Sequence, residues 1–297
     1  MKKSKFSITD DDFKLLTNLW RWKILTTSMI HSSAYSHRSL SACYKRLNRL
    51  ECYKYIESFS SRDAKRWFWQ LTDKGYRVLN FDESEIKQNG FKSEHKDHDF
   101  LVTLFHFGIE QTLLLNSNSA IYTEQELRRI EIENYPDWVP HTKQHRPDGY
   151  FKLDRSLSND KSLVAIEVEL NLKSAQKYFD LGQFYSDTLA IHQVLWLVKT
   201  ETDAQFILNN LKKGSSQKET EHSFIILSQW FDQLWQTKIF IGKKQNQNIE
   251  FVIGTIQEPS TGSVPDKVLF EFRKKLINST VITNQTKSLI NLSKIIG

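Results

Sequence analysis

The sequence predicts a mixed α/β fold with two domains, and two observations support this prediction. In residues 10–80, three segments with a helical spacing of apolar residues precede two short, aromatic-rich segments that are typical of strands. From residue 149 onward, apolar strand-like segments alternate with helical ones, which is the pattern of an α/β sheet domain. At 297 residues, the chain is long enough to form both domains.

The composition excludes several classes of protein. Hydrophobic residues make up 39% of the chain and aromatic residues 12%, as in ordinary globular proteins with apolar cores. No run of about 18 apolar residues occurs, so we expect no membrane insertion. The basic start of the chain lacks the apolar run of a secretory signal. Cys43 and Cys52 alone make neither a zinc cluster nor a disulfide framework, and we expect a reducing, cytoplasmic location.

Positive charge is concentrated at the N-terminus. Residues 1–80 contain 16 lysines and arginines against seven acids, a net charge of +9, although the whole chain carries only +6. The remaining residues therefore sum to −3. A basic segment on a near-neutral body is typical of a protein that binds a polyanion, and the alternative is a solvated basic surface.

The first 51 residues predict three helices. The first has Leu16, Leu19 and Trp20 at helical spacing behind Phe13, and the three aspartates at its start suit a helix N-terminus. Residues 25–30 are expected to form a turn, a threonine cap and a short second helix. The third helix, at about 36–51, is expected to bury an apolar stripe consisting of Leu40, Cys43, Tyr44, Leu47 and Leu50.

Residues 53–59 and 66–71 predict a β-hairpin around a polar turn. Three helices followed by a basic hairpin is the order of a winged helix-turn-helix domain, here residues 1–80. In such domains the third helix enters the major groove of double-stranded DNA and the wing contacts the backbone. The candidate DNA-binding residues are His37, Arg38, Ser41, Lys45, Arg49, Arg62, Lys65 and Arg66.

Residues 81–97 are polar and charged and predict a linker. The second domain is expected over residues 98–260, beginning with a helix at about 98–116 and a short segment at 122–130. Residues 261–297 are expected to form a C-terminal helical tail. In the second domain, strands are expected at 149–153, 163–170, 193–199, 224–227 and 249–256, with helices at 174–191 and 203–212.

The main candidate site lies around two of these strands. Asp148 precedes the first, and Glu167 and Glu169 alternate with apolar residues on the second. Since alternate side chains of a strand share a face, both glutamates project together. Two neighbouring carboxylates repel each other and are costly to bury unless a cation neutralises them. With Asp148 they predict an all-oxygen site for Mg²⁺ or Mn²⁺, and Lys173 could reach a bound phosphate.

A second interpretation of these residues needs no metal. Pro147-Asp148-Gly149 is a common turn sequence, and both glutamates could lie on a solvated surface strand. His145 is either a contact to phosphate, a proton carrier or an ordinary loop histidine. Tyr178 and Tyr185, on the helix after the site, are expected to pack in the core, and a role as covalent nucleophile is the remote alternative.

The pattern resembles the PD-(D/E)XK nuclease superfamily: Pro147-Asp148 on one strand and Glu167-x-Glu169 on the next. The resemblance implies a restriction-endonuclease-like α/β/α domain and metal-dependent DNA cleavage, with Asp148, Glu167 and Glu169 as metal ligands. The superfamily usually has lysine where Glu169 stands, and Lys173 resembles the displaced lysine of some members. Glu124 resembles the additional glutamate that members often supply from an earlier helix.

Most of residues 10–210 resemble the replication-relaxation family, which includes MobC-type relaxases of mobilisable plasmids. The motifs are a winged helix, histidines at the start of a helix, Thr-Glu-x-Glu-Leu-Arg from Thr123, His-Arg-Pro-Asp-Gly from His145 and Glu-Val-Glu-Leu-x-x-Lys-Ser from Glu167. The resemblance implies a nickase that recognises a plasmid transfer origin and cleaves one strand without a tyrosine nucleophile. Its implied partners are accessory mobilisation proteins and a coupling protein.

Two other functions stay open at this stage. The chain could be a non-catalytic winged-helix regulator of plasmid replication or transcription, whose second domain serves dimerisation or partner contact. It could also be a nuclease that acts in transposition or defence. Metal binding and cleavage distinguish the regulator from the nucleases.

Overall fold

The computed structural model describes residues 6–60, 67–79, 92–93, 95–113, 120–154, 161–215, 220–242 and 244–249. Two compact units are present, and the boundary between them falls between Thr103 and Leu104. Helices and two separate sheets confirm the expected mixed α/β fold. Within these ranges, no helix is both long and apolar enough to cross a membrane.

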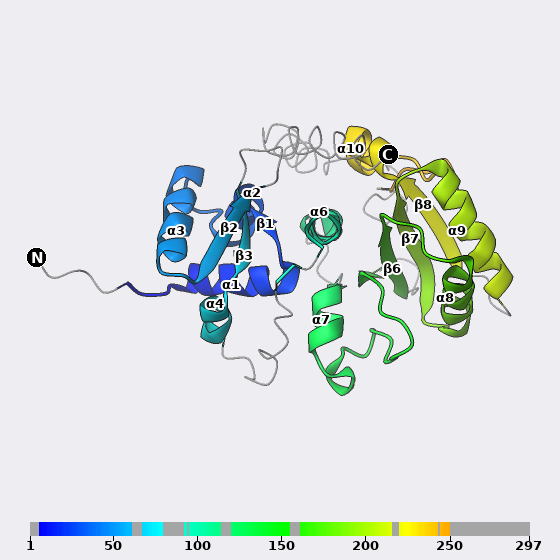
Figure 1. Ribbon diagram of the computed structural model, residues 1–297, viewed down its shortest axis with the longest axis horizontal. Coiled ribbons are helices and arrows are strands. Elements are labelled where there is room, and N and C mark those ends of the chain that lie inside the picture. Colours follow the sequence, from blue (N-terminus) through cyan, green and yellow to red (C-terminus); the bar gives the residue numbers. More distant parts are fainter. Residues whose placement is uncertain are drawn as a thin grey trace, which may run out of the picture. The chain divides into compact units, whose positions relative to one another are not determined.

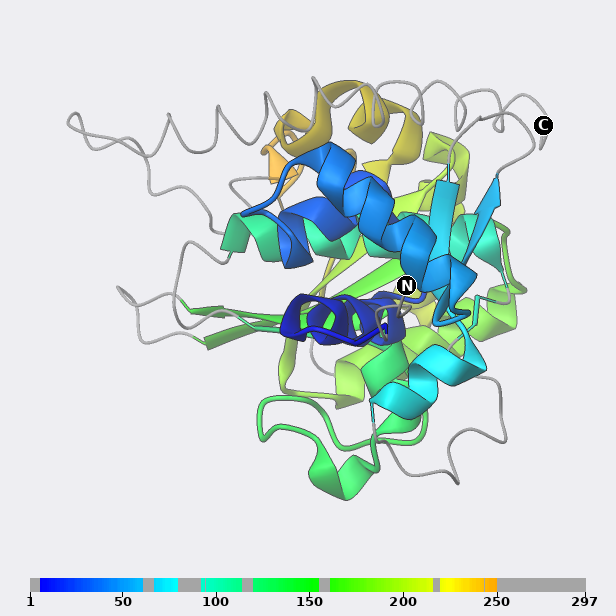
Figure 2. The same cartoon turned by 90° about the vertical axis from the view of Figure 1, so that its left-hand side faces the viewer.

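Among the described residues, the N-terminal unit contains four complete helices and a three-stranded antiparallel sheet of order β1-β3-β2 (Figure 1). Figure 2 shows the same elements in a second view. The two hairpin strands pair from Ile56 with Leu71 to Ser60 with Trp67. The elements are α1 (Asp10–Trp22), β1 (Leu25–Thr26), α2 (Thr27–Ala34), α3 (Leu40–Cys52), β2 (Ile56–Ser60), β3 (Trp67–Leu71) and α4 (Asp73–Val78).

Hydroxyl side chains define where these helices begin. Thr9 and Asp12 form a reciprocal capping box at the start of α1. The Ser39 hydroxyl accepts the Ala42 N–H and so caps α3. The third helix therefore begins at Leu40 rather than near residue 36, and the expected start was wrong because the cap lies three residues further along the chain.

The apolar stripe of α3 is narrower than expected. Cys43, Leu47 and Leu50 are fully buried, whereas Leu40 is 49% exposed and Tyr44 39% exposed. The prediction that Leu40 and Tyr44 belong to the core was therefore wrong. Each residue advances a helix by about 100°, so the three buried positions occupy a narrow arc that Leu40 and Tyr44 flank on one side.

The second unit is built on a five-stranded sheet of order β4-β5-β6-β7-β8. Strands β4, β5 and β6 are antiparallel, and β6, β7 and β8 are parallel. The strands are β4 (Ala120–Thr123), β5 (Gly149–Asp154), β6 (Lys161–Glu169), β7 (Ile191–Val198) and β8 (Glu221–Ile226). The helices of this unit are α7 (Glu124–Arg129), α8 (Ala175–Asp187), α9 (Glu201–Gly214) and α10 (Leu227–Gln233), with short 3-10 turns η1 (Ile132–Asn134) and η2 (Leu234–Gln236). Helix α6 (Lys96–Leu113) contains the boundary between the two units, and its residues from Leu104 onward belong to the second unit.

Helices α8 and α9 cover one face of this sheet (Figure 1). The core beneath them contains Ala165 of β6, Trp196 of β7 and Tyr185 of α8. Since side chains alternate along a strand, Glu167 and Glu169 share the face of Ala165, and Val168 faces the other side. The fold thus directs both glutamates toward the helix-covered face, at the C-terminal end of the central strand β6.

Several sequence predictions differ from the structure at their ends. The helix expected over 174–191 ends at Asp187, because β7 already begins at Ile191. The sequence reasoning missed α10, whose Trp230 is buried against Phe105 of α6. Most of the expected linker at 81–97, the expected strand at 249–256 except for Ile249, and the whole tail at 261–297 lie outside the described residues.

Candidate functional site

Asp148 occupies the junction of three elements. Its backbone N–H donates to Ile166 O (3.0 Å) and its carbonyl accepts the Glu124 N–H (3.1 Å). Its side-chain Oδ2 accepts the backbone N–H of Val168 on β6 at 2.7 Å. The Asp148 carboxylate therefore binds the main chain of β6 at Val168, the residue between Glu167 and Glu169. Asp148, directly before β5, is thus hydrogen-bonded to β6 and to the first residue of α7, which directly follows β4.

Glu167 is the most enclosed acid of the site. Its Oε1 accepts a hydrogen bond from the Tyr185 hydroxyl and lies 2.5 Å from His145 Nε2. Burial by itself raises the pKa of Glu167, but the charge and hydrogen bond of His145, the bond from Tyr185 and the charge of Lys173 hold this pKa below its ordinary value. Glu167 is therefore a buried anion.

Glu169 pairs with Lys173. The Lys173 Nζ lies 2.7 Å from Glu169 Oε2, and the Lys173 backbone N–H donates to the Tyr178 hydroxyl at 3.0 Å. Partial burial lowers the pKa of Lys173, but the bond to Glu169 and the charges of Glu169, Glu167 and Asp148 raise it above its ordinary value. The Lys173 side chain is 47% exposed, so a charged ammonium lies beside the acidic cluster and is accessible to solvent.

Glu124 begins α7, directly after β4. Its backbone contacts Asp148, but its carboxylate Oε1 lies 2.5 Å from Nη2 of Arg128, one turn further along the same helix. The structure therefore brings the Glu124 main chain to the site, while its side chain is engaged by an arginine.

The three central acids are nearly enclosed: Asp148 is 8% exposed, Glu167 5% and Glu169 7%. Oxygen donors of this kind suit Mg²⁺ or Mn²⁺ by their chemistry. However, in the described part of the chain no three His, Cys, Asp or Glu side chains form a group that could hold a metal ion. Each acid instead has its own partner: a backbone N–H for Asp148, His145 and Tyr185 for Glu167, and Lys173 for Glu169.

Two neighbours of the site have clearer roles than the sequence indicated. The sequence left His145 open between three roles, and its ring contacts Glu167. Tyr185 was expected to pack in the core; it is fully buried, but its hydroxyl also donates to Glu167. Both contact the buried carboxylate of Glu167, from positions 22 and 18 residues away in the sequence, and no local pattern predicts such pairs.

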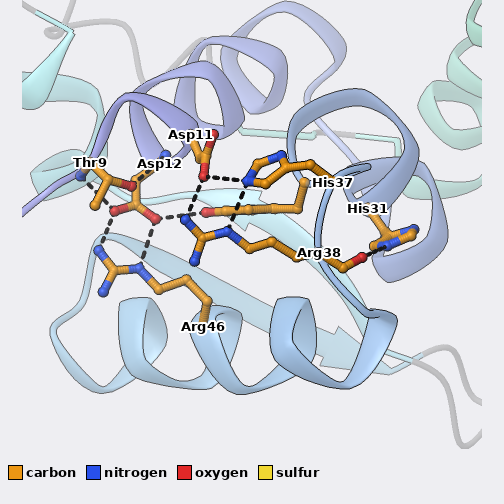
Figure 3. A network of polar contacts seen from close by, with 8 residues as sticks. Thr9, Asp11, Asp12, His31, His37, Arg38 and Arg46 are labelled. Carbon is orange, nitrogen blue, oxygen red and sulfur yellow. Dashed lines mark hydrogen bonds and ion pairs between the residues drawn. The ribbon is translucent and has the colours of Figure 1, made fainter.

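The candidate DNA-binding residues separate into three groups. Ser41, Lys45 and Arg49 are exposed on α3. His37 and Arg38 lie before α3, and their side chains contact Asp11 of α1 at 3.3 and 2.7 Å (Figure 3). The wing candidates Arg62, Lys65 and Arg66 lie outside the described residues.

A buried ion pair ties α3 to α1, and sequence reasoning missed it. The guanidinium of Arg46 contacts both carboxylate oxygens of Asp12, with Nε 2.8 Å from Oδ1 (Figure 3). The Tyr35 hydroxyl donates to the same Oδ1 at 2.6 Å, and Asp12 is fully buried. This network fixes the orientation of the helix that carries Ser41, Lys45 and Arg49.

The Asp12 network predicts a pH dependence of stability. Burial raises the pKa of Asp12, but hydrogen bonds from Arg46, Tyr35 and Thr9 outweigh this effect and hold the pKa below its ordinary value. The contribution of ionised Asp12 is therefore fully present above the unfolded-state pKa of about 3.9 and is lost as the pH falls through the lower folded-state value. The difference in free energy of unfolding between wild type and Asp12→Asn should be large at pH 7 and shrink below about pH 4.

Urea unfolding of the full chain at a series of pH values measures this difference. Asp10→Asn, which alters an exposed aspartate of the same helix turn, is the matched control and should produce a much smaller difference at pH 7. A difference for Asp12→Asn that stays constant from pH 7 to pH 2 would show that the carboxylate charge contributes nothing.

The chain was also compared with known proteins. No protein-family model matches it, and neither the curated proteins nor the solved structures contain a significant match.

Proposed function

We propose that this chain is a metal-dependent DNA endonuclease that binds double-stranded DNA through its N-terminal unit and nicks one strand at the Asp148 site. The observation that carries this proposal is the burial of Asp148, Glu167 and Glu169 around one strand end, with Lys173 beside them. Burying three carboxylates is costly even when each has a partner. Active sites are where proteins retain such costly arrangements.

In this proposal Asp148 and Glu167 would hold Mg²⁺ or Mn²⁺, and Glu169 would serve as a further ligand or as a base. A bound divalent ion would supply an activated water and a positive charge beside the phosphodiester. Lys173 would bind a phosphate oxygen, because its ammonium is charged and half exposed. His145 and Tyr185 would position Glu167 through its Oε1. Glu124 would support Asp148 from α7.

The biological setting follows from the resemblance to the replication-relaxation family. We infer a cytoplasmic relaxase that recognises a plasmid transfer origin for mobilisation. Accessory mobilisation proteins and a coupling protein would be its partners. The exposed cations of α3 and the helix-and-hairpin arrangement of the N-terminal unit support the DNA-binding part of this proposal.

The test is nicking of a supercoiled plasmid that carries a DNA segment to which the purified chain binds. With Mn²⁺ or Mg²⁺, the wild type should convert the plasmid to open circles, and Asp148→Asn should reduce the rate by about 100-fold, since it removes a metal-binding charge. Asparagine keeps an oxygen that can accept the Val168 N–H, so the fold should survive.

Asp187→Asn is the matched control, because Asp187 is exposed at the end of α8, away from the cluster, and this variant should nick at the wild-type rate. Circular dichroism checks that both variants are folded. Equal rates for the wild type and Asp148→Asn would show that the catalytic assignment is wrong.

A second candidate is a non-catalytic winged-helix regulator of replication or transcription. The observation that favours it is that each acid has its own partner and no three-ligand group occurs among the described residues. This candidate predicts salt-dependent DNA binding without any effect of metal. Calorimetric titration with Mn²⁺ that shows no binding, together with retained DNA binding, would favour the regulator over the nuclease.

A further inference from the structure

Two large apolar side chains lie on the exposed surface of α3, where a soluble helix usually has polar ones. Leu40 and Tyr44 are 49% and 39% exposed. Because they are four residues apart, they lie one above the other on the same side of the helix. Leu40 is the first residue of α3, directly after the Ser39 cap. The apolar pair therefore begins at the N-terminal end of the helix.

A polar pair runs beside the apolar one. Ser41 and Lys45 each follow a member of the apolar pair in the sequence, and both are exposed. Arg49 continues this exposed surface one turn further. The only acid of α3 is Glu51, and its Oε1 accepts the Ser58 backbone N–H at 2.9 Å. The exposed surface of α3 thus combines cations with two apolar groups, which suits a polyanion that also presents apolar groups.

DNA has this combination in its major groove, where the phosphates are anionic and each thymine presents a C5-methyl group. In helix-turn-helix proteins the N-terminal residues of the third helix contact the base edges. We propose that Leu40 and Tyr44 contact thymine methyl groups, while Ser41 and Lys45 bind the polar edges of neighbouring bases. This inference rests on the DNA-binding part of the proposed function and adds the chemical feature of the sequence that is recognised.

The other possible occupant of this surface is a second copy of the chain. The apolar pair could be buried in a dimer. In that dimer, Lys45 and Arg49 would lie near Lys45 and Arg49 of the second copy and repel them, unless the two helices were offset. The charge of α3 therefore favours DNA, and self-association is an outcome that the experiment must detect.

The experiment replaces thymine by deoxyuridine, which lacks the C5-methyl group and keeps the hydrogen-bonding groups. A duplex that the full chain selects from a random library is made with single thymine-to-uracil changes. Its Kd for the wild type is measured by fluorescence anisotropy without added metal. Removing a buried methyl group should weaken binding about fourfold at each contacted thymine.

Leu40→Ala should bind the unmodified duplex more weakly and should lose this sensitivity at one or more thymines, and Tyr44→Ala should do the same at others. Phe13→Ala is the matched control, because Phe13 is a 45% exposed apolar residue on α1, and it should retain the full sensitivity. Light scattering measures the mass of every variant.

Equal sensitivity of the wild type and both α3 variants would overturn the proposal, and so would the absence of any effect of uracil. A wild-type dimer that Leu40→Ala dissociates would assign the surface to self-association. A wild type that nicks DNA but binds the thymine and uracil duplexes equally contradicts only this inference. A wild type that distinguishes these duplexes but does not nick DNA contradicts only the catalytic assignment.

Discussion

Replacing Arg46 by methionine is expected to lower the free energy of unfolding of the N-terminal unit by about 3–5 kcal/mol, because it leaves the buried carboxylate of Asp12 without its cation. Methionine fills much of the volume of the arginine stem, so the expected loss arises mainly from the uncompensated charge. Tyr35 and Thr9 would still donate hydrogen bonds to Asp12, but neither carries a positive charge.

Hydrogen exchange measured by mass spectrometry on peptides from α1 and α3 reports this loss for the N-terminal unit within the full chain. Arg49→Met is the matched control, since Arg49 is exposed on the same helix. This variant should change the free energy of opening, as derived from hydrogen exchange, by less than about 1 kcal/mol. Similar protection of both variants would show that the Asp12–Arg46 pair does not hold α3 in place.

Replacing Gly182 by alanine is expected to destabilise the second unit by about 3 kcal/mol. Helix propensity alone predicts the opposite sign, since alanine is favoured over glycine inside a helix by about 1 kcal/mol. In the structure, however, a Cβ on Gly182 of α8 would lie 2.1 Å from the carbonyl oxygen of Leu211 on α9. A backbone atom cannot rotate away, so the two helices would have to separate.

The contact is reciprocal, because a Cβ on Gly214 of α9 would lie 2.0 Å from the carbonyl oxygen of Phe179 on α8. Urea unfolding that is followed by circular dichroism measures the effect of Gly182→Ala. Gln183→Ala, at the exposed neighbouring position, should leave the free energy of unfolding within about 0.5 kcal/mol of the wild type. A gain in stability for Gly182→Ala would show that propensity outweighs the helix contact.

Local patterns in the sequence were enough to predict the mixed α/β fold. Strand alternation placed Glu167 and Glu169 on one face of β6, and the structure agrees, since Tyr185 and Lys173 contact them on the helix-covered side. The helix-and-hairpin order of the N-terminal unit was also predicted, because short-range spacing and capping residues determine these elements. The hydroxyl of Ser39, a local signal, could have located the start of α3.

The partners of the charged side chains came only from the tertiary structure. The bonds from Asp12 to Arg46 and from Glu167 to His145 and Tyr185 join residues 18 to 34 positions apart, and the geometry of several packed elements decides them. The exposure of Leu40 and Tyr44 likewise depends on how α3 rotates against its neighbours, which the spacing of apolar residues specifies only to within a wide arc. Thus the sequence by itself determined which residues form each element and which acids share a strand face. Only the tertiary structure decided what each buried charge contacts, because a pairing between distant segments leaves no periodic signal in the chain.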